Sequence, residues 1–382
     1  MGLDKKQISA DLNRWDDLPF HQTVASLGRP SNSDSHFNDG YYFAFYGQGH
    51  HFFMGLRLHP NNNVLDGYVG VVCQGKQRSQ RFSRALLPAR DSLVVGPLSV
   101  EIVEPMQRQR VTLVDSQINL KFDIQFEAVG DPFVEAEAPQ IRFGRVINHL
   151  IRYTQPARAN GYFELDGKRI DVANWFGARD HSWGIRSTMG PYVPHGGIIE
   201  HENENDLRAL RLWVPFEVGD HSGFFHLHED SDGAVLDSEG RIDFKDGTSR
   251  NIVRVVHQLK YVPQTTRLCG GTIDLILDDG QTHQYQISDI YDPAHPQGFG
   301  YTRGWVDGGQ PGVYRGQYHT EHEEFSVVVS DLATGPDHVP VSKRLGGTEF
   351  ACVFQHESGW GMAHVEHMIY RKYLPYGLLL DS

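Results

Sequence analysis

Short runs of alternating hydrophobic and polar residues recur along most of this 382-residue chain. Alternation with a period of two places successive side chains on opposite faces of a strand. The clearest runs are Gly40–Phe45, His51–Leu58, Tyr68–Gln74, Leu98–Val103, Ile118–Phe126 and Ile252–Leu259. Only residues 6–16 and Val146–Tyr153 have a helical pattern. The chain is therefore predicted to be all-β, with many antiparallel strands.

Turn residues separate these runs, most clearly the Asp-Gly pairs at 166–167, 232–233, 246–247 and 279–280. Glycine accepts the positive φ of tight hairpin turns, and 40 glycines with 19 prolines fit a helix-rich fold poorly. Antiparallel sheets of this size close into barrels or stack as sandwiches to remove exposed edges. We expect two such units, residues 1–190 and residues 191–382, joined near the linker-like segment Ser187–Gly197.

Composition narrows the class of protein. Hydrophobic residues make up 39% and charged residues 22%, as in globular proteins. A formal charge of −13 disfavours binding to a nucleic-acid backbone. No apolar run has the length of a membrane span, and no apolar signal segment follows Met1. The three cysteines are widely spaced, which fits a reducing compartment. These features predict a cytoplasmic protein without a nucleic-acid partner or a membrane span.

Residues 177–186 contain the densest group of side chains that could take part in catalysis or binding. An acid, an imidazole, an indole and two guanidinium groups lie there together with two glycines. If the preceding strand continues, Asp180 and His181 point to opposite faces, while His181 and Trp183 share one face. The segment is either a proton-transfer site beside an apolar wall, or a structural Asp–Arg pair with Trp183 in the core.

Two further segments carry candidate groups. Gly298–Trp305 interleaves glycines with aromatic residues, which predicts a bulged strand or a barrel mouth with Tyr301 and Trp305 on one face. His319, Glu321 and Glu323 alternate to one face, either as a carboxylate–imidazole cluster or as a solvated edge strand. His364 and Glu366 share a face of the last predicted strand, either as catalytic groups or as a satisfied polar pair in the core.

The chain contains 21 histidines, but a metal site is the less favoured interpretation of them. His226 and His228 have the same-face spacing seen in β-sandwich metal sites, but metal sites usually need three or four convergent ligands. The chain contains no HExxH, GxSxG, GxGxxG or P-loop pattern. We therefore expect no metal and no cofactor.

Gly177–Gly184 resembles the Asp-His-x-Trp-Gly signature of the carotenoid 1,2-hydratase (hydroxyneurosporene synthase) and AttH-like families, which are lipocalin-like, calycin-type β proteins. Gly298–Trp305, Gly312–Gly316 and Gly359–Glu366 are similar in order and character to segments of the same group. The resemblance implies two lipocalin-like halves with an apolar pocket. It also implies that an acid protonates an alkene and that an indole stabilises the resulting cation. The chain departs from the pattern at residues 208–215, where Arg211 and Trp213 replace an expected Tyr-x-Asp pair.

Together these features predict a cofactor-independent lyase or isomerase, a hydratase–dehydratase or a related proton-transfer enzyme, acting on a hydrophobic terpenoid or aromatic small molecule. The candidate catalytic residues are Asp180, His181, Tyr301, His364 and Glu366; the candidate substrate-binding residues are Arg179, Trp183, Arg186, Trp213 and Trp305. The alternative is a non-enzymatic, lipocalin-type carrier of a hydrophobic ligand. The sequence leaves a homodimer open.

Overall fold

The computed structural model describes residues 12, 14–27, 29–137, 139–142, 145–193, 208–263, 265–301, 303–328, 347–370 and 372–378. Strands dominate, and no α-helix occurs among these residues. Helical turns are short 3-10 segments: η1 (Arg14–Asp17), η2 (Pro60–Asn62), η4 (Pro296–Phe299) and η6 (Leu374–Tyr376). None of the helices in this described part is long and apolar enough to cross a membrane.

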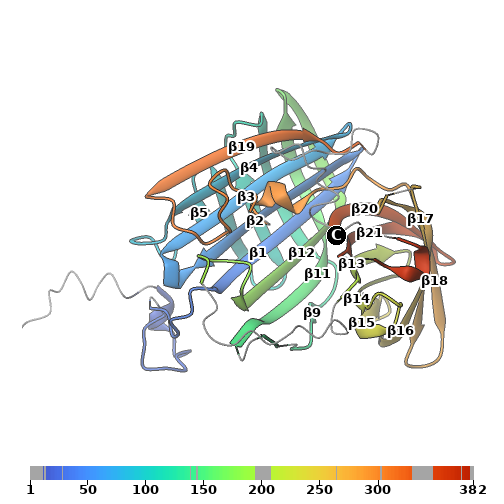
Figure 1. Cartoon of the computed structure of the whole chain (residues 1–382). Coiled ribbons are helices and arrows are strands. Elements are labelled where there is room, and N and C mark those ends of the chain that lie inside the picture. The colour runs from blue at the N-terminus through green and yellow to red at the C-terminus, as the bar shows by residue number, and fades with distance from the viewer. Residues whose placement is uncertain are drawn as a thin grey trace, which may run out of the picture.

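The first sheet has 13 strands and curls into a half-barrel (Figure 1). Its strands run in the order β19-β4-β3-β2-β1-β12-β11-β8-β7-β6-β5, and β9 and β10 pair with β11. Their bounds are β1 (Phe37–Gly47), β2 (His50–His59), β3 (Val64–Cys73), β4 (Lys76–Ala85), β5 (Val94–Val95), β6 (Leu98–Glu104), β7 (Arg108–Leu113), β8 (Leu120–Ala128), β9 (Phe133–Val134), β10 (Gln140–Arg142), β11 (Arg145–Leu165), β12 (Lys168–Arg186) and β19 (Tyr318–Ser326).

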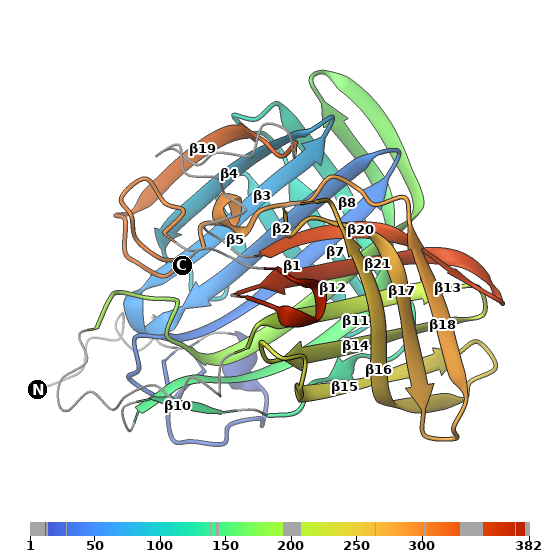
Figure 2. The same cartoon turned by 45° about the vertical axis from the view of Figure 1, so that its right-hand side comes forward.

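The second sheet is a closed eight-strand barrel that lies beside the half-barrel (Figure 2). Its strands run in the order β13-β14-β15-β16-β17-β18-β20-β21. Their bounds are β13 (Leu210–Val218), β14 (His221–Glu229), β15 (Val235–Phe244), β16 (Ser249–Tyr261), β17 (Leu268–Leu277), β18 (Thr282–Ser288), β20 (Gly347–His356) and β21 (Gly359–Ile369). Closure leaves this sheet without an unpaired edge.

Strand alternation divides the apolar residues into three clusters. One fills the half-barrel and includes Phe43, Phe45 and Phe126. A second fills the closed barrel and includes Phe216, Val365 and Phe354. The third lies between the two sheets: Tyr42, Ala44 and Tyr46 on β1 meet Phe299 of η4 and Ala351 of β20. Successive residues of β1 thus alternate between the half-barrel core and the junction between the sheets.

The prediction of two lipocalin-like β units is confirmed, and each strand predicted from alternation lies within or overlaps an observed strand. The four Asp-Gly pairs connect β11 to β12, β14 to β15, β15 to β16 and β17 to β18. The helical prediction for Val146–Tyr153 is wrong, because this segment belongs to β11 and pairs with β12. Cross-strand pairing has overridden local preference there. The described part of residues 6–16 contains only the beginning of η1, and the rest lies outside the described residues.

Strand β19 follows most of the closed barrel in the sequence but pairs with β4 at the edge of the half-barrel (Figure 1). The chain therefore returns to the first sheet before completing the second. Segment 298–305, predicted as a bulged strand or a barrel mouth, contains no strand among its described residues: Gly298 and Phe299 belong to η4, and turns follow. Gly300 has a φ of +87° and ends η4, a conformation that fits glycine and interrupts a strand.

Candidate functional site

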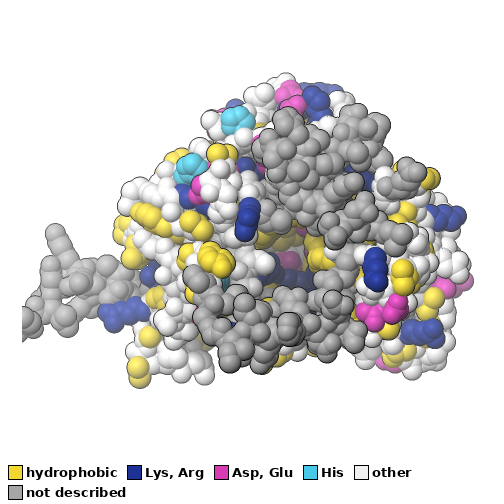
Figure 3. All heavy atoms as spheres, in the orientation of Figure 1, with side chains coloured by type: hydrophobic (Ala, Val, Ile, Leu, Met, Phe, Trp, Pro, Cys, Tyr) yellow, Lys and Arg dark blue, Asp and Glu magenta, His cyan; other side chains and the backbone are white. Residues whose placement is uncertain are grey.

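A cluster of ionisable side chains lies where the outer face of the half-barrel meets the outer face of the closed barrel. From the half-barrel come Tyr42 on β1, Arg57 on β2, Arg152 on β11, and Asp180 and Arg186 on β12. From the closed barrel come Arg211 and Trp213 on β13, Glu349 on β20, and His364 and Glu366 on β21. Figure 3 shows a hollow on this side of the molecule, with apolar side chains and charged groups of both signs in its depth.

Register explains why these residues meet. Tyr42 lies directly opposite Asp180 in the pairing of β1 with β12, so the two side chains share a face. In the closed barrel, Leu212 and Val365 point into the core, so the neighbouring residues Trp213 and Glu366 point outward. Sequence alternation on both sheets therefore presents polar side chains to the junction.

Glu349 is the carboxyl group whose surroundings most favour its protonated form. The Tyr42 hydroxyl donates a 2.6 Å hydrogen bond to its Oε2 atom. Burial raises the pKa of Glu349 well above its usual range, and the negative charges of Glu366 and Asp180 raise it further. At neutral pH this residue can hold a proton inside the site.

Glu366 has the opposite character. Arg211 Nη2 donates a 2.9 Å hydrogen bond to its Oε2 atom. Burial by itself raises the pKa of Glu366, but Arg211 and Arg152 outweigh burial and lower it. Two neighbouring carboxyl groups thus differ in protonation, as in sites that separate an acid from an ionised group.

Asp180 lies beside Arg152, with 3.9 Å between Oδ2 and Nε, and its side chain keeps 16% exposure. Its Oδ1 atom has no hydrogen-bond partner among the described residues. Burial raises the pKa of Asp180, and Arg152 and Arg57 oppose that rise. A buried carboxylate oxygen without a partner can accept a proton or a hydrogen bond from a ligand that reaches it.

Two guanidinium groups of the site, those of Arg57 and Arg186, form no direct salt bridge among the described residues. Arg57 donates to neutral oxygens, Oδ1 of Asn38 at 2.5 Å and Oγ of Ser182 at 3.1 Å. Within the described chain, neither Arg57 nor Arg186 forms a salt bridge with a carboxylate. Burial, with Arg152 and Arg57 nearby, lowers the pKa of Arg186 to about 10. Arg186 is still protonated at pH 7, so it carries a charge available to an anion or a carbonyl oxygen.

Aromatic rings form the apolar part of the junction. Tyr68 and Phe299 are stacked with ring centres 5.0 Å apart, and Tyr301 meets Tyr68 edge-on at 6.2 Å. On the closed-barrel side, Trp213 meets the His364 ring at 5.5 Å. Trp213 Nε1 donates a 2.9 Å hydrogen bond to Oε1 of Glu135, which fixes the indole.

The Gly177–Gly184 motif does not form a turn. β12 continues through it, so Asp180 and His181 lie on opposite faces, as the alternation predicts. Gly184 has a φ of +133°, and a Cβ there would lie 2.1 Å from the carbonyl oxygen of His149. Glycine is therefore required for close approach of β11, rather than for approach of a ligand.

His181 belongs to a separate cluster on the half-barrel side. Its Nε2 atom lies 2.7 Å from Oδ1 of Asp39, and its Nδ1 atom lies 3.2 Å from the Tyr153 hydroxyl. Trp183 lies 5.1 Å from the His181 ring, and Arg179 donates to Oε1 of Gln155 at 2.9 Å. These three predicted residues share one face of β12 and do not meet Asp180.

The other predicted residues divide as follows. The structure brings Asp180, Arg186, Trp213, His364 and Glu366 to the junction, with Tyr301 in the aromatic group there. His364 is buried, and its Nδ1 atom makes a short hydrogen bond with the Tyr46 hydroxyl. Trp305 lies elsewhere, with the Arg315 guanidinium 3.9 Å from its ring centre.

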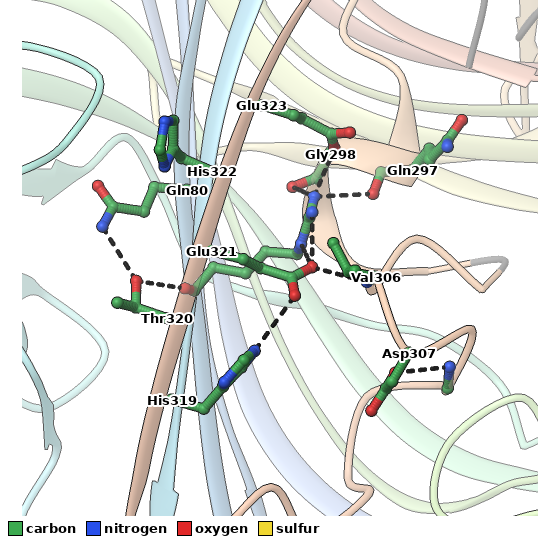
Figure 4. Close-up of polar contacts among 12 residues, drawn as sticks. Gln80, Gln297, Gly298, Val306, Asp307, His319, Thr320, Glu321, His322 and Glu323 are labelled. Atoms are coloured by element: carbon green, nitrogen blue, oxygen red, sulfur yellow. Dashed lines mark hydrogen bonds and ion pairs between the residues drawn. The ribbon is translucent and has the colours of Figure 1, made fainter. Parts of the chain in front are cut away.

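The acidic stretch of β19 surrounds one buried cation. Arg81 on β4 is 1% exposed, and it contacts Glu321 at 2.7 Å and Glu323 at 2.5 Å. His319 lies 3.2 Å from the other oxygen of Glu321. Figure 4 shows both glutamates beside the backbone carbonyls of Gln297 and Gly298, which Arg81 also contacts. Same-face alternation is confirmed, and this cluster holds β19 and η4 together.

His226 and His228 are close enough to Asp237 to form a possible three-ligand group. His226 Nε2 lies 3.0 Å from Oδ2 of Asp237. His228 Nε2, however, accepts a 2.9 Å hydrogen bond from Arg211 Nη1. This pair therefore connects to the charged junction through Arg211.

Sequence reasoning missed Tyr42, Arg57, Glu135, Arg152 and Glu349. Tyr42 and Glu349 are 307 positions apart in the chain, and neither belongs to a motif. Their sequence signal is a polar group at a strand position next to a buried phenylalanine, Phe43 for Tyr42 and Phe350 for Glu349.

Comparison with solved structures supports the fold. A crystal structure described as an AttH candidate of Nitrosomonas europaea aligns with a TM-score of 0.53 and 10% identity, covering 88% of this chain and 93% of that one. CghA with Sch210972 aligns with a TM-score of 0.47 and 9% identity, covering 88% and 89%. At this identity the first likeness shows an AttH-like, lipocalin-type fold and nothing about activity.

No curated protein matches the sequence. A family model matches residues 12–378, which is nearly the whole chain, and its description is a family of unknown function, DUF8625. The match includes both sheets and every residue of the junction. The chain belongs to this family of unknown function, DUF8625.

Proposed function

We propose that this protein is a lyase or isomerase that moves protons on a hydrophobic small molecule, of terpenoid or aromatic type, bound at the junction of the two sheets. One observation carries the proposal: Glu349 and Glu366 are neighbouring carboxyl groups whose pKa values are shifted in opposite directions. Such a pair supplies an acid and a fixed negative charge in one site. The chemistry described below needs no cofactor.

Glu349 is the proposed acid. Tyr42 donates to its Oε2 atom, so the proton of the neutral carboxyl resides on Oε1. Transfer of that proton to an alkene carbon of the substrate forms a carbon–hydrogen bond and leaves a cation on the adjacent carbon. The π faces of Trp213 and Tyr68 suit stabilisation of that cation.

Asp180 is the proposed base. Its unpartnered Oδ1 atom can take a proton from a carbon next to the cation, which gives an isomerised alkene. Where a water molecule adds to the cation instead, Asp180 accepts the proton that the water releases, and the product is an alcohol. In both cases one proton leaves Glu349 and one reaches Asp180, and exchange with solvent restores the starting state.

Arg57 and Arg186 are the proposed binding groups for a polar end of the substrate. Neither forms a direct salt bridge among the described residues, although Asp180 lies near both, and a buried charge without a direct contact is costly. A carboxylate, enolate or carbonyl oxygen of the ligand would compensate both groups. The proposed substrate is thus an apolar molecule with one such oxygen.

Solvent deuterium incorporation tests the proposal. The protein is incubated in D2O with a panel of apolar alkenes that carry a carboxylate or carbonyl group, and mass spectrometry follows uptake of deuterium at carbon. We expect uptake with the wild type, a loss of about 100-fold or more in Glu349→Gln and in Asp180→Asn, and no change in Glu127→Gln, an exposed control.

A carrier would behave differently. It would retain a ligand from the panel for hours without deuterium uptake, and both variants would bind that ligand as the wild type does. That outcome would contradict the proposed enzyme activity and support a lipocalin-type carrier instead.

A further inference from the structure

Three histidines lie together inside one end of the closed barrel. His221 begins β14, His283 is the second residue of β18, and His356 ends β20. On each strand the residue two positions or four positions away belongs to the barrel core, namely Phe225, Tyr285 and Phe354. Alternation therefore turns all three imidazoles inward.

The three rings are nearly equidistant. Their centres are 5.5 Å apart for His221 and His283, 5.0 Å for His221 and His356, and 5.0 Å for His283 and His356. One ring nitrogen from each residue lies within 4.8 Å of the other two. A tetrahedral Zn²⁺ with Zn–N bonds of about 2.05 Å places its imidazole centres roughly 5 Å apart. The observed triangle fits that geometry.

Outer contacts hold two of the rings. Nδ1 of His221 lies 2.9 Å from Oδ1 of Asp220, which leaves Nε2 as its inward atom. Nδ1 of His356 accepts a 3.0 Å hydrogen bond from the Ser358 backbone N–H and lies 2.9 Å from the Ser358 hydroxyl, and its Nε2 atom lies 3.1 Å from Nδ1 of His283. A carboxylate or hydroxyl behind a histidine is the usual outer shell of a metal site.

We propose that His221, His283 and His356 bind one divalent transition-metal ion, best matched by Zn²⁺. Three neutral imidazoles and a water molecule complete a tetrahedral set. The Tyr285 hydroxyl lies 2.7 Å from Nε2 of His221 and can hydrogen-bond to that water once the metal takes the nitrogen. Metal binding at Nε2 of His356 moves the ring proton to Nδ1, which then donates to Ser358 Oγ and no longer accepts from the Ser358 backbone N–H.

Burial shields the inner side of the cluster, because His221 is 1% and His283 is 8% exposed. His356 is partly exposed, which gives an ion access to the cluster. The exposed carboxylate of Asp220 adds a negative charge behind His221.

This site is independent of the proposed reaction. The histidines face the interior of the closed barrel, whereas Trp213 and Glu366 face outward from it, toward the half-barrel. Loss of the metal would leave the carboxyl groups of the junction in place. A negative result for metal binding would therefore not count against proton transfer at the junction, and the reverse also holds.

The test is titration of chelator-treated, full-length protein with Co²⁺ and Zn²⁺. Isothermal calorimetry gives affinity and stoichiometry, and the visible absorption of Co²⁺ reports a tetrahedral nitrogen site. We expect one ion per chain and a rise in the melting temperature with Zn²⁺. In His283→Gln/His356→Gln we expect affinity at least 100-fold weaker and no rise, while the control His319→Gln, an exposed histidine, binds as the wild type does.

Two further variants keep the proposal falsifiable. Asp220→Asn retains all three ligands and should weaken binding about tenfold, so it provides a readout even if the double variant does not fold. His226→Gln/His228→Gln removes the other histidine group and should leave binding unchanged. Binding that survives loss of His283 and His356, or that disappears only with His226 and His228, would overturn the proposal. So would a wild type that binds no ion.

Discussion

The hydroxyl of Tyr42 donates a 2.6 Å hydrogen bond to Oε2 of Glu349, and this bond joins the half-barrel to the closed barrel. Tyr42 belongs to β1 and Glu349 belongs to β20, so the bond exists only when the two sheets are packed together. It also positions the proposed acid. The proposed acid is therefore positioned only when the two sheets have packed against each other.

Removing the Tyr42 hydroxyl should shift the pH dependence of turnover. Tyr42 stabilises the ionised carboxylate, which lowers the pKa of Glu349, so Tyr42→Phe should raise that pKa further. The acid must be protonated to act, and activity is lost as pH rises through its pKa. The basic limb of the pH–rate profile should therefore move to higher pH, at a stability cost of about 1 kcal/mol. A basic limb that stays fixed or moves to lower pH would contradict the role of Glu349.

Arg186→Gln should weaken binding of anionic ligands selectively. The substitution removes a positive charge that forms no direct salt bridge among the described residues, while a side chain of similar length remains. Affinity for an apolar carboxylate should fall at least about tenfold, since a charged hydrogen bond contributes roughly 1.5–3 kcal/mol. Affinity for the matching neutral alcohol should hardly change. Equal losses for both ligands, measured by fluorescence titration, would rule out an anion-binding role.

The pair of Arg211 and Glu366 should show strong coupling in a double-mutant cycle. Arg211 is 11% and Glu366 is 18% exposed, so Arg211→Met leaves a mostly buried carboxylate without its main partner. We expect a loss of about 3–5 kcal/mol in the free energy of unfolding. Arg211→Met/Glu366→Gln should recover a large part of that loss. Additive effects of the two substitutions in urea unfolding would show that the pair is not coupled.

Arg81→Met should loosen β19. Arg81 is 1% exposed and contacts both Glu321 and Glu323, so its loss leaves two carboxylates near each other without a cation. Hydrogen exchange of the β19 amides should become faster, with a loss of about 3 kcal/mol in stability. Lys76→Met is the matched control, because Lys76 makes an exposed salt bridge with Glu324 across the same two strands and should cost less than about 1 kcal/mol.

Stability should decline as the solution is acidified below pH 6.5. His51, His59 and His295 are fully buried, and burial lowers each pKa from 6.5 to about 3. Between these values the unfolded chain binds protons that the folded chain does not, so stability is present above pH 6.5 and is lost as pH falls. These three groups contribute about 4 kcal/mol per pH unit to the slope.

Urea unfolding at a series of pH values from 7 to 4.5 measures this slope. His295→Gln removes one of these groups, so the slope should fall by about 1.4 kcal/mol per pH unit. A free energy of unfolding that stays constant over this range would contradict the burial of neutral imidazoles.

The sequence by itself determined the local elements of this protein. Period-two alternation fixes strands such as His51–Leu58, because one face must be buried, and Asp-Gly pairs fix the hairpins, because they accept positive φ. The same alternation predicted that Asp180 and His181 lie on opposite faces, and that His364 and Glu366 share one. Each of these inferences depends only on neighbours in the chain.

Tertiary structure alone decided which of these faces meet. Glu349 and Asp180 reach one site, and His221, His283 and His356 reach another, because strands distant in sequence pack or pair with each other. Alternation placed His181 on the face opposite Asp180, and the pairing of β12 with β1 and β11 gave it Asp39 and Tyr153 as partners. Strand periodicity specifies the side of a sheet, but the pairing of remote strands and the packing of the two sheets depend on the summed burial of the whole chain, which no local pattern contains.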